Sequence, residues 1–164
     1  MFDAEITTLA TAVLDACRSG GVTVATVESC TGGLVGGALT AIAGSSDVVL
    51  GGLITYSNAA KTALAEVPGD LLDTHGAVSE PVARAMAAGG CAALSATFSV
   101  AITGVAGPGG GSVAKPVGLV HFACAGPDGT AHRERRFGPL SRDEIRRLSV
   151  LTALEMLREA ASAR

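Results

Sequence analysis

Near its N-terminus the chain runs Val27-Glu28-Ser29-Cys30-Thr31-Gly32-Gly33. This stretch continues the apolar, β-branched run that starts at Val22 and leads directly into the apolar residues 34–39. Such a pattern is typical of a strand that delivers a hydroxyl side chain to the first turn of a helix. Backbone N–H groups are unpaired at a helix N-terminus and can hold a developing oxyanion. The stretch therefore predicts a strand–helix junction with Ser29 as a candidate nucleophile.

A second stretch, Ile54-Thr55-Tyr56-Ser57-Asn58-Ala59-Ala60-Lys61, follows another apolar run. It contains the only tyrosine of the chain, and only two of the 12 basic residues, Lys61 and Lys115, are lysines. A lysine among apolar and small residues can lose its proton at neutral pH and act as a base, which an arginine cannot do. Serine, lysine and a phenol together indicate a hydrolase.

Strand and helix patterns alternate along the rest of the chain. Periodicity and capping signals predict helices over residues 3–18, Thr31–Ala43, from Asn58 to Leu64 or Ala65, from Ser79 to about Leu94, and from a Ser141/Glu144 capping box onward. Apolar runs predict strands over Val22–Val27, Val48–Thr55 and Thr97–Thr103, followed by a hairpin of Gly118–Cys124 and Ala131–Phe137. A loop is expected through His75-Gly76. These elements indicate a mixed sheet with helices on both faces, in a single domain over 1–164.

Composition excludes several classes of protein. The net charge of −3 argues against nucleic acid as the main partner. The four cysteines form no CxxC pair, which argues against zinc and favours buried free thiols. The acidic start Met1–Glu5 does not resemble a signal peptide, so we expect a cytoplasmic protein. Residues 85–114 carry no charge, but their glycines and hydroxyls indicate a buried helix, strand and loop rather than a membrane span.

Each candidate residue also has a purely structural interpretation. Ser29 or Thr31 could simply cap a helix, although the neighbouring glycines would let a substrate approach the backbone closely. Cys30 is a rival nucleophile, but no histidine adjoins it in sequence. Lys61 could be solvated, and Tyr56 could end a strand with its hydroxyl in water. His75 is expected to pack locally rather than to act as a base.

Two further features suit an anionic ligand. The run from Gly104 through Gly107 and Gly111 to Ser112 follows a predicted strand that ends at Thr103, and its N–H groups could face a phosphate or form a plain loop. Arg142 and Arg146 lie one turn apart at the start of the last helix. They could clamp a phosphate, or they could pair with nearby carboxylates. The residues alone leave both alternatives open.

Six ordered segments together resemble the CinA C-terminal domain family, whose enzymatic members are nicotinamide mononucleotide amidohydrolases of the PncC type. The resemblance covers nearly the whole chain. It is carried by residues 28–33, 43–46, 55–61, 75–80, the glycine run 104–112, and Lys115-Pro116-Val117-Gly118. It implies a three-layer α/β/α sandwich with a mixed, mostly parallel sheet, and a serine/lysine mechanism without metal or cofactor. Many relatives carry this domain behind a larger N-terminal domain, and we expect this chain to be the stand-alone form.

The resemblance implies a role for each candidate residue. Ser29 would be the nucleophile, Lys61 its base and Tyr56 a supporting hydroxyl. Backbone N–H groups near Cys30, Thr31 and Gly32 would hold the oxyanion. The nucleotide would be held by residues around these groups: Gly33, Thr103, Gly104, Gly107, Gly111, Ser112 and Arg142 or Arg146.

The sequence thus predicts deamidation of nicotinamide mononucleotide to nicotinic acid mononucleotide and ammonia. A non-catalytic nucleotide-binding module is the main alternative, and a Cys30 thiol hydrolase is a third. The expected partner is a small pyridine nucleotide. Apolar helix faces further suggest a homodimer or a higher homo-oligomer.

Overall fold

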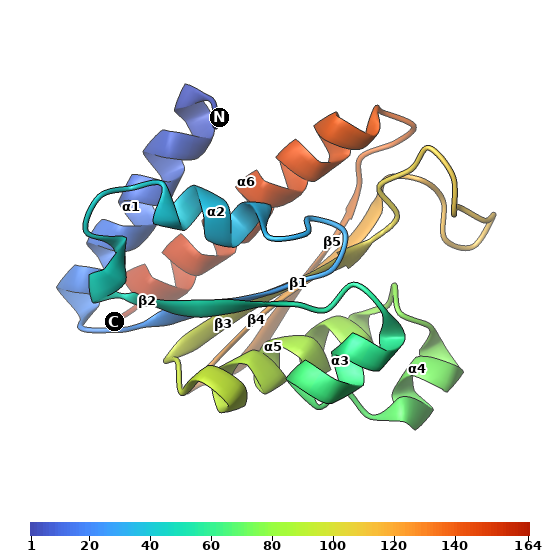
Figure 1. Ribbon diagram of the computed structural model, residues 1–164, viewed down its shortest axis with the longest axis horizontal. Helices are drawn as coiled ribbons and strands as arrows, with labels where there is room; N and C mark the ends of the chain where they lie inside the picture. The colour runs from blue at the N-terminus through green and yellow to red at the C-terminus, as the bar shows by residue number, and fades with distance from the viewer.

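A computed structural model describes all 164 residues and is built on a five-stranded sheet (Figure 1). The strands lie in the order β2-β1-β3-β4-β5. Their bounds are Val24–Glu28 for β1, Val49–Ile54 for β2, Phe98–Gly104 for β3, Leu119–Gly126 for β4 and Gly129–Arg136 for β5. The central β1 pairs in parallel with β2 and β3, whereas β4 and β5 continue the sheet antiparallel. Three of the five strands therefore run parallel, and their carboxyl ends share one edge.

Helices cover both faces of this sheet (Figure 1). One face carries α1 (Ala4–Gly20), α2 (Leu34–Thr40) and α6 (Arg142–Ser162). The opposite face carries α3 (Asn58–Ala65), α4 (Gly69–His75) and α5 (Glu80–Leu94). A short 3₁₀ helix, η1 (Ser45–Asp47), precedes β2. The predicted three-layer α/β/α sandwich with a mixed sheet is confirmed.

The two faces are packed with side chains of different size. A cluster of 27 buried apolar residues, rich in Val, Ile and Leu, joins the sheet to α1, α2 and α6. The cluster beneath α5 has 11 residues, and most of them are alanine or valine. Small side chains let helices approach closely: an added Cβ on Gly89 of α5 would lie 1.9 Å from the carbonyl oxygen of Ala65 in α3. Gly89 thus allows the close approach of α3, which carries Lys61.

Most predicted elements are confirmed within a few residues. The predicted hairpin turns at 126–129. Ser141 caps α6, and its hydroxyl accepts a hydrogen bond from Glu144 N–H. The predicted helix Thr31–Ala43 is wrong at its start. α2 begins only at Leu34, because Gly32 (φ 61°) and Gly33 (φ 100°) hold left-handed conformations. The cap of α3 is Ser57 rather than Asn58.

The 66–78 region is also more regular than predicted. Residues Gly69–His75 form the helix α4, where a loop was expected, and it ends at Gly76 with φ 72°. Ser79 precedes α5 as predicted, but its hydroxyl donates to the carbonyl of Gly76 instead of capping the helix. Seven residues are too few to show a clear periodic pattern, which is why the sequence did not reveal α4.

No helix of the structure combines the length and the apolar character that a membrane span requires. Residues 85–114, the long uncharged segment, fold as the second half of α5, then β3, then a glycine-rich loop. All four cysteines are free thiols; Cys17, Cys30 and Cys124 are buried as predicted, whereas Cys91 is half-buried.

We expect Gly89→Ala to destabilise the protein by about 1–3 kcal/mol, because the new methyl group would collide with the Ala65 carbonyl and force α3 away from α5. Glycine to alanine within a helix ordinarily stabilises. Gly69→Ala is the matched control, since nothing lies within 4 Å of its Cβ position. Urea unfolding of both variants checks this, and equal stability of the two would contradict it.

Candidate active site

The candidate catalytic residues meet at the carboxyl ends of the parallel strands. Ser29 directly follows β1, Tyr56 follows β2 by two residues, and Thr103 is the penultimate residue of β3. Ligands bind in such crevices in open α/β sheets because the chain leaves the sheet there in different directions. A cavity of about 220 Å³ lies at this edge, and seven of its lining residues were predicted from the sequence: Ser29, Cys30, Tyr56, Lys61, Thr103, Gly104 and Arg142.

Ser29 and Lys61 are in hydrogen-bonding contact. The Nζ of Lys61 lies 3.2 Å from the Oγ of Ser29, although the residues come from opposite faces of the sheet. Only 1% of the Lys61 surface and 8% of the Ser29 surface is exposed. The structural alternative, a solvated Lys61, is therefore wrong: α3 directs the side chain beneath the sheet edge.

The remaining contacts of the Lys61 amine are backbone carbonyls. Nζ lies 2.8 Å from the oxygen of Thr55 and 3.4 Å from that of Tyr56. No carboxylate forms an ion pair with it. Burial lowers the pKa of Lys61 below its ordinary value of 10.5, because the charged form loses its hydration. This environment favours the neutral amine, the form that can accept a proton.

The turn 29–33 connects Ser29 to α2 through backbone hydrogen bonds. Ser29 N–H donates to the carbonyl of Ile102 in β3, and Gly32 N–H donates to the carbonyl of Ser29. The N–H groups of Cys30 and Thr31 have no acceptor within the protein. The prediction that Ser29 lies at the first turn of a helix is wrong, because α2 starts five residues later. Of the three predicted oxyanion donors, Gly32 is therefore not available, because its N–H is already bonded to Ser29. Cys30 lines the cavity, whereas Thr31 is fully buried and does not line it.

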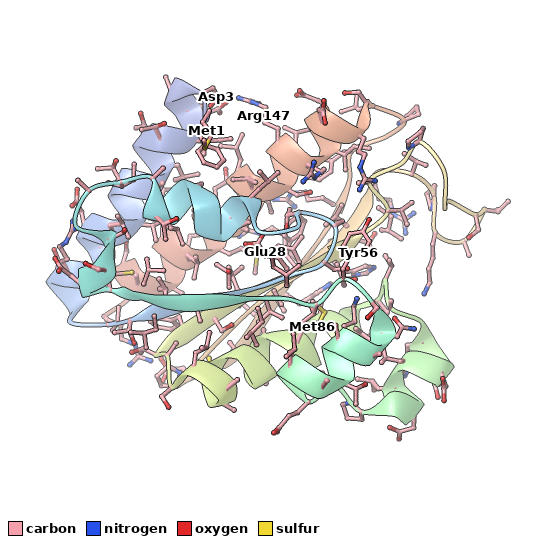
Figure 2. All side chains as sticks on the ribbon, in the orientation of Figure 1. Met1, Asp3, Glu28, Tyr56, Met86 and Arg147 are labelled. Carbon is pink, nitrogen blue, oxygen red and sulfur yellow. The ribbon has the colours of Figure 1, made fainter.

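Arg142 and Tyr56 form one wall of the cavity. Arg142, the first residue of α6, donates to the carbonyl of Gly107 (2.8 Å) and to the hydroxyl of Tyr56 (3.3 Å). No carboxylate pairs with Arg142, so its positive charge is not neutralised by the protein. Tyr56 is 62% exposed and extends over the edge of the sheet (Figure 2). Between the two arginine alternatives left open by the sequence, Arg142 is the one that lines the cavity.

Arg146 lies behind the turn rather than in the cavity. Its Nη2 donates to the carbonyl of Thr31 at 3.2 Å, and its Nε is buried without a partner. It supports the backbone of the turn from the α6 side. The two predicted arginines therefore have different positions: one lines the cavity and the other lies against the turn.

The residues of the glycine-rich run also differ in whether they lie at the cavity. Gly104 lines the cavity, and Gly107 contributes the carbonyl that orients Arg142. Gly111 packs against Val117, and Ser112 is exposed and caps a turn at Lys115, so neither lines the cavity. Gly33 likewise lies outside it, and its N–H donates to Glu28. Thr103 lines the cavity but donates its hydroxyl to the carbonyl of Ala77, which secures the opposite wall.

The structure favours Ser29 over Cys30 as nucleophile. Burial raises the pKa of the Cys30 thiol to about 12, so the reactive thiolate is not formed near neutral pH. His75 does not line the cavity, and its carbonyl accepts from Lys115 (2.6 Å). No group of three or more His, Cys, Asp or Glu residues is arranged to hold a metal ion.

Sequence reasoning missed Glu28. Its carboxylate is buried directly before Ser29 and accepts backbone N–H groups from the start of α2. An acidic residue at the end of an otherwise apolar strand was the available signal, since a charge is almost never fully buried without partners.

Comparisons with known proteins agree with this architecture. The profile of the CinA C-terminal domain matches residues 6–161. A CinA-like protein of Synechococcus sp. (strain RCC307) is 59% identical over 158 residues, which cover 96% of this chain and 38% of the relative. A CinA-like protein of Mycolicibacterium gilvum is 52% identical, covering 87% of this chain and 34% of that protein. The chain thus spans little more than a third of the length of these curated relatives.

Solved structures match over almost the full length. The competence/damage inducible protein CihA from Agrobacterium tumefaciens superposes with a TM-score of 0.95 at 49% identity, covering 98% of both chains. A competence-damaged protein (CinA) superfamily protein from Klebsiella pneumoniae gives 0.92 at 31% identity, covering 97% of this chain and 99% of that one. The match of profile, relatives and fold shows that the chain belongs to the CinA C-terminal domain family.

Proposed function

We propose that this protein is an amidohydrolase that converts nicotinamide mononucleotide to nicotinic acid mononucleotide and ammonia. The observation that carries the proposal is the 3.2 Å contact between the buried Lys61 amine and the Ser29 hydroxyl, in a cavity without an acidic partner for the lysine. A nucleophile within hydrogen-bond reach of a base is the signature of covalent catalysis. The substrate identity rests on the family to which the chain belongs.

The contacts of the Lys61 amine indicate that it can take a proton from Ser29. A neutral amine has two N–H groups and one lone pair. The two carbonyls, of Thr55 and Tyr56, accept the N–H groups. Ser29 Oγ accepts from the third N–H when the amine is charged; when the amine is neutral, its lone pair faces Oγ over the same 3.2 Å and can accept the serine O–H. In this protonation state the amine is already oriented to remove the serine proton.

The reaction then proceeds through an acyl-enzyme. Ser29 Oγ attacks the carboxamide carbon while Lys61 takes its proton, and the carbonyl oxygen becomes an oxyanion. We assign the oxyanion to the N–H group of Cys30, which lines the cavity and has no acceptor in the protein, with the unpaired N–H of the adjoining Thr31 as the second donor. The C–N bond breaks as Lys61 returns the proton to the leaving nitrogen, which departs as ammonia. Lys61 then takes a proton from water, whose oxygen attacks the acyl carbon. The ester C–O bond breaks as Lys61 returns this proton to Ser29 Oγ, which releases nicotinic acid mononucleotide and regenerates the enzyme.

Arg142 is the proposed phosphate ligand. Its guanidinium lines the cavity without a carboxylate partner, and Gly107 holds one edge of it. Arginine binds phosphate through two parallel N–H groups, which suits the monophosphate of the substrate. Tyr56, hydrogen bonded to the same arginine, would orient it. A cytoplasmic location and a homo-oligomeric state stay predictions from the sequence.

Purified protein should release ammonia from nicotinamide mononucleotide, and Ser29→Ala and Lys61→Ala should each lower kcat by at least about 1,000-fold, because each removes a member of the same catalytic unit. A coupled ammonia assay measures this. Binding of the nucleotide without ammonia release by the wild type would instead support a nucleotide-binding module. Survival of activity in Ser29→Ala would point to Cys30.

The rate should depend on the protonation of Lys61. The base must be neutral, and burial lowers its pKa below 10.5, so kcat/KM should rise with pH and level off before an ordinary lysine would titrate. The pH profile of kcat/KM measures this value in the free enzyme. A rise centred at or above 10.5 would contradict a buried, neutral base.

Arg142→Ala should raise KM about tenfold or more, since a hydrogen bond to a charged group contributes roughly 1.5–3 kcal/mol. kcat should change less, because the phosphate lies away from the reacting carbonyl. Arg135→Ala, on the exposed face of β5, is the matched control and should leave both constants unchanged. Equal KM values in the two variants would exclude Arg142 as the phosphate ligand.

A further inference from the structure

Glu28 occupies an unusual position immediately before the nucleophile. It is the last residue of β1 and only 1% exposed. Figure 2 shows its side chain between the sheet and α2. The carboxylate accepts three backbone hydrogen bonds: Oε2 from Gly33 N–H (3.0 Å) and Val35 N–H (3.1 Å), and Oε1 from Gly36 N–H (2.8 Å). The strand before Ser29 and the helix after it are thus joined by one side chain.

The carboxylate has no cationic partner. None of the ion pairs in the protein includes Glu28. Three N–H groups and the positive end of the helix dipole compensate its charge instead. Gly33, with φ 100°, turns the chain so that its own N–H reaches the carboxylate. The local sequence therefore places a buried acidic group where α2 begins.

This arrangement has a direct effect on the turn 29–33. The N–H groups at the start of α2 are already bonded to Glu28, so they are not available to a substrate anion. The two N–H groups of the turn that remain unpaired belong to Cys30, which lines the cavity, and to the adjoining Thr31. Glu28 thus pairs the N–H groups at the start of α2, while the N–H of Cys30, at the cavity, stays unpaired.

We propose that Glu28 is a positioning residue for the nucleophile: its carboxylate, by holding the first N–H groups of α2, sets the turn that places Ser29 against Lys61 and leaves the Cys30 and Thr31 N–H groups for the oxyanion. The proposal rests on the proposed amidohydrolase function. It assigns Glu28 no proton transfer, because its oxygens face the helix and not the cavity.

The role requires a carboxylate rather than any polar side chain. Three donors face the two oxygens of Glu28, so both oxygens must accept. A glutamine has the same shape, but its amide nitrogen can only donate and would face an N–H group. Either one or two of the three hydrogen bonds would be lost, and the turn would shift. A displacement of about 1 Å in a catalytic group can lower the rate by about 100-fold.

The test compares Glu28→Gln with Val13→Ala, a variant that removes buried volume in α1 far from the cavity and lowers stability without touching the turn. We expect Glu28→Gln to lower kcat about 100-fold with KM within about threefold, because the substrate still meets Arg142. Val13→Ala should keep the wild-type kcat. Wild-type kcat in a folded Glu28→Gln variant, or an equal loss in Val13→Ala, would overturn the proposal.

Glu28→Asp is the second variant, for the case that Glu28→Gln does not fold. Aspartate keeps the charge but is one methylene shorter, so it should hold the N–H groups less well and lower kcat at unchanged KM. A folded Glu28→Asp variant with wild-type kcat would equally overturn the proposal.

A substrate-independent readout separates this proposal from the proposed function. A fluorophosphonate probe reacts with an activated serine, whatever the natural substrate. If the wild type is labelled at Ser29 but does not hydrolyse nicotinamide mononucleotide, the substrate assignment fails. The role of Glu28 is then tested by the labelling rate alone, and we expect the probe to label Glu28→Gln more slowly than the wild type. If the wild type is not labelled, Ser29 is not activated, and both proposals are overturned.

Discussion

The site depends on a lysine amine that is buried without an acidic partner. A charged ammonium in this position would have lost most of its hydration, and only backbone carbonyls and one hydroxyl face it. Lowering the pKa of Lys61 is therefore a consequence of the packing and not of a neighbouring charge. A nearby carboxylate would have stabilised the ammonium and removed its basicity. The absence of one is what makes the pair with Ser29 chemically useful.

Both faces of the sheet are needed to form that pair. Ser29 is held from the side of α2, through the turn 29–33, whereas Lys61 comes from α3 on the opposite face. The close approach of α3 and α5, made possible by Gly89, brings the lysine under the sheet edge. On the other side Glu28 holds the start of α2. The contact between Ser29 and Lys61 thus crosses the end of the sheet, where neither helix layer alone could provide it.

Much of the architecture was predictable because local and tertiary preferences agree. Apolar runs in the sequence predict the buried strands, and the capping box at Ser141 predicts the start of the final helix. Predictions were wrong where backbone conformation overrode the pattern. Gly32 and Gly33, interpreted as the start of a helix, adopt left-handed conformations that delay α2 to Leu34. The helix α4 is too short for a periodic signal, and most of its residues are exposed.

The sequence by itself determined the chemical types at the site: one serine in a glycine-rich turn, one of two lysines, one tyrosine, and a pair of arginines one turn apart. Residue type and spacing carry that information because each chemistry needs particular groups. Only the tertiary structure decided that Lys61 is buried and that Arg142, not Arg146, lines the cavity. It also revealed the role of Glu28 between strand and helix. Burial and distance depend on contacts between segments far apart in the chain, and a local pattern does not contain them.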